Sequence, residues 1–365
     1  MQLFTKITST AVLTGIIGTG SLLSAGIASA AGIQGISFGG SAPSDYYVYD
    51  VSGNKTVRIP STKGNAQKVL DGNAASPTGN VELAASSETA GFDFTKNTTL
   101  RGVLGTSYGS QPITLSSLTL SDWLTVLPSG QTLQQQWFSD LENKYKAIST
   151  FSAAGAAASA TSVATAAGTN ARNAALASGK TAVQAQAAYN TVYNATYPQA
   201  YSQAYTALYN NTYTSAYNAF IDPNLKLRQR LSDPNISYVN SAADGSVKIG
   251  LAGFLNANPL FGAPIPAGTP SNLVAILNAL SNTPMQASEL VKVTYGGNTS
   301  YLYSFTANAS GLVAADDGRS HTGNYEVYLS APPSRAVPVP AAFLGIAAAG
   351  AVGGLMMQRR KASLV

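Results

Sequence analysis

The sequence predicts a mainly β or α+β domain that is interrupted by an Ala/Tyr-rich insert and followed by one C-terminal transmembrane helix. Residues 31–151 and 221–331 contain short runs of β-branched and aromatic residues separated by Gly, Asn and Ser, which is the pattern of strands and tight turns. Residues 152–220 replace this pattern with a long stretch that favours helix or low complexity. Residues 341–358 are uncharged and long enough to cross a hydrocarbon core as a helix.

The first part of the domain, residues 31–151, opens with a predicted hairpin whose turn is Ser52-Gly53-Asn54. Residues 60–92 are polar and rich in Gly, Asn and Ser, so a loop is expected there. Ser121-Asp122 is expected to cap a helix that begins at Trp123. The strands predicted in this part are 45–51, 55–59, 99–104 and 113–120.

An amphipathic helix is predicted over residues 131–151. Its apolar residues recur at spacings of three or four, which places them on one helical face. We expect this face to pack on the sheet. The residues are Leu133, Trp137, Leu141, Tyr145, Ile148 and Phe151.

The second part of the domain, residues 221–331, returns to the β pattern. Ala243-Asp244-Gly245 is the predicted turn of a second hairpin, and Ser271 is expected to cap a short helix through Leu280. Residues 332–340 are Pro-rich and predict a stiff, extended stalk. The strands predicted here are 236–239, 247–251, 289–295, 300–306 and 325–329.

The insert, residues 152–220, is first Ala-rich and then carries a tyrosine at every fourth position. On a helix each ring would lie over the next, but the stripe would turn by about 40° per step and about 280° in total, so no flat partner could bury all of it. A strand of this length is unusual, and Pro198 is expected to kink or break a helix near Tyr197. This tyrosine ladder consists of Tyr189, Tyr193, Tyr197, Tyr201, Tyr205, Tyr209, Tyr213 and Tyr217.

The tyrosine ladder has two interpretations. It is either a low-complexity spacer, helical in pieces and partly disordered, or an aromatic surface for ligand binding or self-association. The second interpretation rests on the ability of tyrosine to stack against sugar faces and to hydrogen-bond through its hydroxyl group.

The N-terminus has the pattern of a signal peptide. Lys6 precedes an apolar stretch, and Ala28-Ser29-Ala30 provides the small residues that a signal peptidase requires. Residues 1–30 are therefore expected to be removed after Ala30, and the body of the chain is expected to be exported.

The C-terminus has the pattern of a membrane anchor or sorting signal. Pro338-Val339-Pro340 precedes the predicted transmembrane helix, and Arg359-Arg360-Lys361 follows it within the short tail 359–365. Because basic clusters stay in the cytoplasm, these three cations are expected to stop transfer of the chain across the inner membrane.

This order of Pro-x-Pro, apolar helix and terminal basic cluster resembles the PEP-CTERM sorting signal. Pro338, Val339 and Pro340 fall on the family's Pro-Glu-Pro, with Val339 in place of the glutamate. The resemblance implies that an exosortase, a membrane protease or transpeptidase, is the processing partner. A plain anchor that no enzyme cuts is the alternative.

A second segment carries a related resemblance. Residues 230–240, Arg-Leu-Ser-Asp-Pro-Asn-Ile-Ser-Tyr-Val-Asn, are followed by Gly-Leu-Ala-Gly at 250–253. Together they are similar to a PEP-CTERM family seen mainly in cyanobacteria, whose function is undefined. The similarity implies that this chain is related to that family, but it implies no molecular function.

The charge of the chain gives no sign of nucleic-acid binding. Four of the 21 basic residues lie in the two targeting segments, which leaves 17 against 16 acidic residues in the body. Charged residues make up only 10% of the chain, so Ser, Thr, Asn, Gln and Tyr must solvate its surface. A surface of this kind suits contact with extracellular polysaccharide.

Few catalytic arrangements are open to this sequence. It has no cysteine and one histidine, His321, so a thiol nucleophile and a zinc site with several His or Cys ligands are excluded within one chain. A triad would have to use His321 with the nearby Ser320 and Asp316 or Asp317, but this segment is better explained as a polar turn. A pair of glycosidase carboxylates stays open. No catalytic residue, metal site or cofactor is assigned.

The sequence thus favours a non-catalytic protein that passes through the inner membrane to the cell surface or the extracellular matrix and associates with polysaccharide. A carbohydrate-binding module tethered to the envelope is the first alternative, and an extracellular hydrolase is the second.

Overall fold

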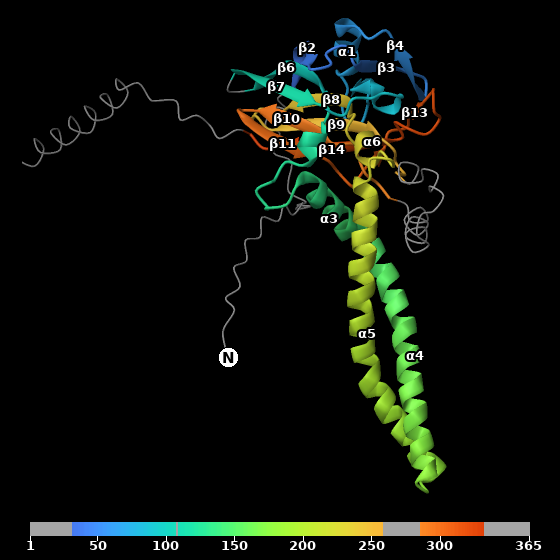
Figure 1. Cartoon of the computed structure of the whole chain (residues 1–365). Coiled ribbons are helices and arrows are strands. Elements are labelled where there is room, and N and C mark those ends of the chain that lie inside the picture. Colours follow the sequence, from blue (N-terminus) through green and yellow to red (C-terminus); the bar gives the residue numbers. More distant parts are fainter. Residues whose placement is uncertain (1–30, 107–108, 258–284, 332–365) are drawn as a thin grey trace, which may run out of the picture.

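The computed structural model describes residues 31–106, 109–257 and 285–331, and within them the chain is α+β. Two β-sheets pack against each other, and two long helices extend away from them as a hairpin (Figure 1). The prediction of an α+β chain is confirmed.

The larger sheet has nine strands and draws them from both sides of the insert. Its central strand β5 pairs with β3 on one side and with β8 on the other, so residues before and after the insert form one sheet. Its spatial order is β12-β14-β9-β8-β5-β3-β4-β13, with β1 paired to β8. The strands are β1 (Ala31–Gly32), β3 (Tyr46–Ser52), β4 (Lys55–Ile59), β5 (Gly79–Leu83), β8 (Asn235–Ser241), β9 (Val247–Gly253), β12 (Asn308–Ala309), β13 (Val313–Ala314) and β14 (Gly323–Leu329).

The smaller sheet has five strands in the order β11-β10-β7-β6-β2. β7 pairs with β10, which again joins the two parts of the domain. The strands are β2 (Gln34–Gly40), β6 (Thr98–Thr106), β7 (Gly109–Ser116), β10 (Val291–Tyr295) and β11 (Asn298–Leu302).

The main hydrophobic core fills the space between the two sheets. Alternate residues of each strand point into it, as expected for sheets with one buried face. Val81 and Ile249 from the larger sheet and Leu115 and Val293 from the smaller one are all fully buried in this core.

A second hydrophobic cluster joins the helices to the sandwich. The rings of Trp137 and Phe220 stack with their centroids 4.9 Å apart, and Trp123 contacts Phe220 edge-on at 5.7 Å. This cluster fixes the root of the helical hairpin. The helices are α1 (Lys63–Val69), the 3₁₀ helix η1 (Ala85–Glu88), α2 (Leu120–Trp123), α3 (Leu133–Tyr145), α4 (Ala147–Ala177), α5 (Ala182–Ile221) and α6 (Leu227–Arg230).

Both predicted hairpins are confirmed. The first is formed by β3 and β4, and the second by β8 and β9. The predicted strands 99–104, 289–295 and 325–329 correspond to β6, β10 and β14. The strands predicted over 113–120 and 300–306 are shorter than expected, because β7 ends at Ser116 and β11 at Leu302.

The prediction of a loop over residues 60–92 is wrong. This stretch contains α1, β5 and η1. All five residues of β5 are buried, including the polar Asn80 and Glu82. Its polar residues therefore do not mark an exposed face, and the alternation of apolar and polar residues could not be read as a half-exposed strand.

The helix predicted over residues 131–151 is in fact divided. α3 ends at Tyr145 and α4 begins at Ala147, because Lys146 takes a left-handed backbone conformation with φ of 54°. The apolar spacing continues across the break, since Ile148 and Phe151 belong to the same second cluster as Trp137. Periodicity alone could not reveal the change in chain direction.

The prediction that Ser121-Asp122 caps a helix is also wrong. Thr119 caps α2, and Asp122 is the third helical residue, whose carboxylate returns a hydrogen bond to the Thr119 amide. The carboxylate therefore completes a capping box instead of starting the helix.

No helix in the described ranges is long and apolar enough to cross a membrane. The predicted transmembrane helix 341–358, the signal peptide 1–30, the stalk 332–340 and the helix from Ser271 to Leu280 lie outside those ranges.

Candidate functional site

The tyrosine ladder lies on α5 of the helical hairpin. At about 1.5 Å per residue, the 40 residues of α5 span about 60 Å. α4 ends in a Schellman motif in which Gly179 takes φ of 78° and Lys180 N–H donates to the Ala175 carbonyl at 3.1 Å. Thr181 and Gln184 then form the capping box that starts α5. The turn residues thus specify an antiparallel pair.

The ladder is continuous helix, so the expectation of a spacer that is helical in pieces and partly disordered is wrong for these residues. α5 passes through Pro198, which lies on the exposed side of the helix. Proline removes one backbone hydrogen bond, but it does not end a helix whose other face is packed.

The tyrosines stack on one another along α5. Successive rings from Tyr189 to Tyr213 have centroids 5.8 to 6.2 Å apart and interplanar angles of 14° to 30°. The faces of the inner rings are therefore turned toward neighbouring rings. Stacking of sugars on those faces, which the sequence suggested, does not fit this geometry; ring edges and hydroxyl groups are what the ladder can offer.

The partner of the ladder is a stripe of small residues on α4. The buried positions of α4 recur every fourth residue, as the tyrosines do on α5, and at Gly168 an added Cβ would lie 2.8 Å from the Tyr189 ring. A period of four is longer than the 3.6 residues of one helical turn, so each stripe winds around its own helix in the right-handed sense. Because both stripes wind in the same way, the two helices can stay in contact along their length, whereas a flat surface could contact only part of the ladder. The small residues of the stripe are Ser152, Ala156, Ala160, Ala164 and Gly168.

The root of the ladder is held in the second hydrophobic cluster. The rings of Tyr213 and Tyr217 lie edge-on to Phe138 at 5.2 and 5.5 Å. Burial raises the pKa of Tyr209 and of Tyr213 above that of a free phenol, so both stay neutral at physiological pH. These residues anchor the hairpin.

The exposed side of α5 is polar but uncharged. α5 contains no Asp, Glu, Lys or Arg, and α4 contains only Arg172. The residue after most of the ladder tyrosines carries an amide or hydroxyl group and is exposed, which gives a second column of period four. These residues are Asn190, Asn194, Ser202, Thr206, Asn210, Thr214 and Asn218.

His321 is a structural residue of the sandwich. It is 4% exposed, its Nδ1 lies 2.7 Å from Thr56 Oγ1 and 3.3 Å from Asn80 Nδ2, and burial lowers the pKa of the imidazole to about 4. The Asp317 carboxylate accepts hydrogen bonds from the amides of Arg319 and Ser320 in its own turn. The segment is the polar turn that was predicted, and these bonds do not assemble a Ser-His-Asp relay.

Three buried carboxyl groups lie close together and were not predicted: Glu82 on β5, Asp233 just before β8 and Glu289 just before β10. Burial, together with Asp233 and Glu82, raises the pKa of Glu289 well above its usual value, and Asn235 N–H donates to Glu289 at 2.8 Å. Asp233 accepts a hydrogen bond from Ser87. No group of three metal-ligating side chains suited to an ion occurs among the described residues. Nothing in the sequence pattern indicated this cluster, because the three residues are far apart in the chain.

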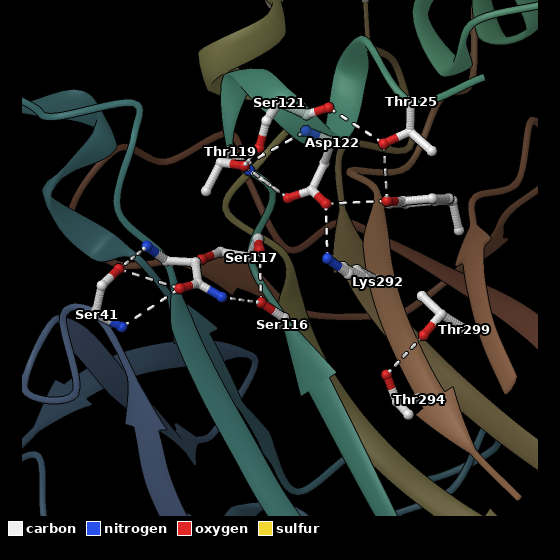
Figure 2. A network of polar contacts seen from close by, with 12 residues as sticks. Ser41, Ser116, Ser117, Thr119, Ser121, Asp122, Thr125, Lys292, Thr294 and Thr299 are labelled. Carbon is white, nitrogen blue, oxygen red and sulfur yellow. Dashed lines mark hydrogen bonds and ion pairs between the residues drawn. The ribbon is translucent and has the colours of Figure 1, made fainter. Parts of the chain in front are cut away.

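A polar network ties α2 to the smaller sheet (Figure 2). Asp122 accepts hydrogen bonds from Lys292 Nζ at 2.7 Å and from the Tyr301 hydroxyl at 2.9 Å. Burial alone would raise the pKa of Asp122, but the hydrogen bonds from Lys292 and Thr119 outweigh it and hold this pKa below its usual value. All the groups of the network are paired with one another, so it serves to hold the helix on the sheet.

The remaining predicted site residues lie outside the described ranges. These are Ala28 and Ala30 of the signal cleavage site, Pro338, Val339 and Pro340 of the sorting motif, and the cluster Arg359, Arg360 and Lys361. Comparisons with protein-family models, with curated proteins and with solved structures found no match.

Proposed function

We propose that this chain is an exported, non-catalytic protein of the cell surface or extracellular matrix, sorted by its PEP-CTERM-like tail and associated with extracellular polysaccharide. The observation that carries the proposal is the helical hairpin. Its longer helix, α5, is about 60 Å long, and most of this length lies beyond the cluster that joins it to the sandwich. The exposed column of amides and hydroxyls on α5 carries no charged residue.

Such a surface suits a hydrated polysaccharide. Repeated amide and hydroxyl groups can exchange hydrogen bonds with sugar hydroxyls at many points, and many weak contacts add up to retention without one strong site. The structural role of His321 supports a non-catalytic assignment, because the only imidazole of the sequence is buried and bonded to Thr56 and Asn80.

The test compares native cells with and without exosortase activity. We expect the mature chain of normal cells to begin at Ala31, to lack residues 341–365 and to fractionate with the matrix or outer envelope. Without the exosortase, intact mass should show the tail still attached, and the protein should stay in the inner membrane. An unprocessed tail in the inner membrane of normal cells would contradict the proposal.

A matched pair of variants checks the motif. Replacing Pro338 and Pro340 by alanine should block processing, because these residues stand where the sorting signal has its two prolines. The same change at Pro332 and Pro333, in the same Pro-rich segment, should leave processing intact.

A further inference from the structure

β11 is the last strand of the smaller sheet, and its outer edge is open (Figure 1). It pairs with β10 over all five of its residues without a register shift, through the two-residue turn Gly296-Gly297, in which both residues have positive φ. None of its backbone groups bonds to any other segment of the described chain. The outer row of N–H and C=O groups on β11 is therefore available to another strand.

The other sheet edges are protected in ways that β11 is not. Natural sheets avoid edge-to-edge pairing through very short edge strands, bulges, prolines and charged side chains. β1, β12 and β13 have two residues each, and the strands that β12 and β13 leave partly open, β14 and β4, carry Glu326 and Arg58 there. β2 has a bulge between Gln34 and Ser37. β11 reads Asn-Thr-Ser-Tyr-Leu, with no charge, no proline and no bulge.

A hollow of about 320 Å³ lies beside β11, between this strand and the C-terminal end of β14 in the larger sheet. Val293 and Tyr295 of β10 are buried in the main core, and residues paired across strands share one face of the sheet. Their β11 partners Ser300 and Asn298 therefore lie on the core side, and both line the hollow. Leu302 lines it with them and is only partly buried. The core of the sandwich is thus incomplete on this side.

One added strand would satisfy both features. Paired with β11, it would take up the free backbone groups, and its alternate side chains would lie over the hollow and extend the core. Contacts on the outer face hold β11 in place before a partner arrives, which lowers the entropy lost on pairing. Thr299 Oγ1 lies 3.1 Å from Thr294 Oγ1 (Figure 2), and the Tyr301 hydroxyl donates to Asp122 at 2.9 Å.

We propose that β11 pairs with β11 of a second copy, antiparallel and across a two-fold axis, so that the two five-stranded sheets become one. Overlap of all five residues places the axis at Ser300, the middle residue of the strand. Asn298 then faces the partner's Leu302, and Thr299 faces the partner's Tyr301. No like charges meet at this axis, because the strand carries none.

A second copy fits this edge better than the C-terminal segment of the same chain. Residues 332–340 follow Ala331, which lines the hollow, but four of these nine residues are proline and cannot donate a backbone hydrogen bond. Two five-residue strands form a small interface, so we expect a weak dimer that dissociates at micromolar concentrations. The inference goes beyond the proposed function and depends on neither sorting nor polysaccharide.

The first experiment uses the absence of cysteine from the sequence. In the full chain, Ser300→Cys places one thiol of each copy at the axis, where facing Cα atoms are about 4.5 to 5.5 Å apart and within reach of a disulfide. Thr294→Cys, at an exposed residue of β10 one strand further from the axis, is the matched control. We expect oxidation to link Ser300→Cys into a dimer and to leave Thr294→Cys monomeric. No dimer from Ser300→Cys, or equal yields from both variants, would overturn the inference.

The second experiment measures the dimer by sedimentation of the full chain in detergent. Ser300→Lys sets two cations opposite each other at the axis and should weaken the dimer by about tenfold or more. Thr294→Lys adds the same charge to the same sheet away from its edge and should stay within about threefold. Circular dichroism checks that both variants fold. A parent chain that stays monomeric up to about 100 µM, or a dimer that Ser300→Lys leaves unchanged, would overturn the inference.

The same thiol variant tests the other occupant of the edge. If Ser300→Cys is monomeric and its thiol reacts with a maleimide only after residues 332–365 are removed, the chain's own C-terminal segment covers β11. That result would overturn the pairing of two copies. We expect instead that the thiol of the monomer reacts at the same rate with and without these residues, and that it is protected as the concentration of the chain rises.

Discussion

The sandwich and the helical hairpin obtain their stability in opposite ways. In the sandwich, large apolar side chains such as Leu115 and Ile249 meet between two sheets and exclude water completely. In the hairpin, the small residues of the buried stripe of α4 are alanine, serine and glycine, and the ladder tyrosines of α5 are only half-buried. The hairpin therefore depends on close approach of two helices more than on the amount of apolar area buried.

This difference explains how a long, nearly uncharged hairpin can stand away from the body. The inner tyrosines from Tyr193 to Tyr209 stack on a neighbouring ring with both faces, and Tyr189 lies against Gly168 of α4, so the ladder serves as packing along the hairpin. The amide and hydroxyl column beside it is left for solvent or a partner. Substitutions that act on one region and spare the other can break or sharpen the comparison.

The largest effect is expected where the two regions join. Trp137→Ala removes a fully buried ring that stacks on Phe220 of α5 and contacts Trp123 of α2. The free energy of unfolding should fall by about 3 to 5 kcal/mol, as for other buried aromatic truncations. Urea denaturation followed by far-ultraviolet circular dichroism measures the change. Leu124→Ala, at a residue that is 51% exposed, is the control and should stay within about 0.5 kcal/mol. Similar losses for both variants would contradict a packed joint.

The next effect belongs to the sandwich alone and depends on pH. His321 has a pKa of about 4 in the folded chain, against about 6.5 when unfolded, so the unfolded state binds the extra proton between these values. Stability should therefore fall as the pH drops from about 6.5 to 4, by about 3 kcal/mol from this residue.

The control for this pH effect is His321→Asn. Asparagine tolerates the positive φ of 62° at this position and does not titrate. Urea midpoints measured from pH 4 to pH 7 should show a shallower slope for the variant than for the parent chain. Parallel slopes would mean that His321 can gain its proton without unfolding.

A smaller effect should be confined to the hairpin. Ala160→Leu places a large side chain in the fully buried stripe that faces α5, and overpacking of this kind costs about 1 to 3 kcal/mol. Hydrogen exchange should speed up for amides of α4 and α5 while the strands of the sandwich keep their protection. Ser159→Leu, one residue earlier on the exposed side, should leave exchange unchanged. Faster exchange throughout the sandwich would show that the two regions unfold together.

The sequence predicted most of the sandwich because its strands alternate in the usual way. Hairpins such as β3 and β4 were recognised from short β-rich runs around Gly53, whereas β5 was missed because Asn80 and Glu82 are buried on its second face. That face is covered by segments distant in sequence, including the turn that carries His321, and no local pattern encodes such a contact.

The helical hairpin was predicted only in part, for a different reason. The spacing of four showed that the rings would lie over one another, and this is confirmed. Its partner was missed because the alanine stretch carries its own period of four in residues that all look alike. Only the packed structure shows that Ala156, Ala160 and Ala164 are buried while most of the residues beside them are exposed.

The smallest effect tests the ladder itself. Tyr201 stacks on Tyr197 at 6.2 Å and on Tyr205 at 6.1 Å, so Tyr201→Ala removes two ring contacts and should destabilise the hairpin by about 1 to 2 kcal/mol. Tyr201→Phe keeps both contacts and should behave like the parent chain, because stacking and not the hydroxyl group holds the helices together. Hydrogen exchange of α4 and α5 measures both variants. Equal loss in the two would assign the stability to the hydroxyl groups, and the ladder would then have to be understood as a chain of hydrogen bonds instead of a packed aromatic column.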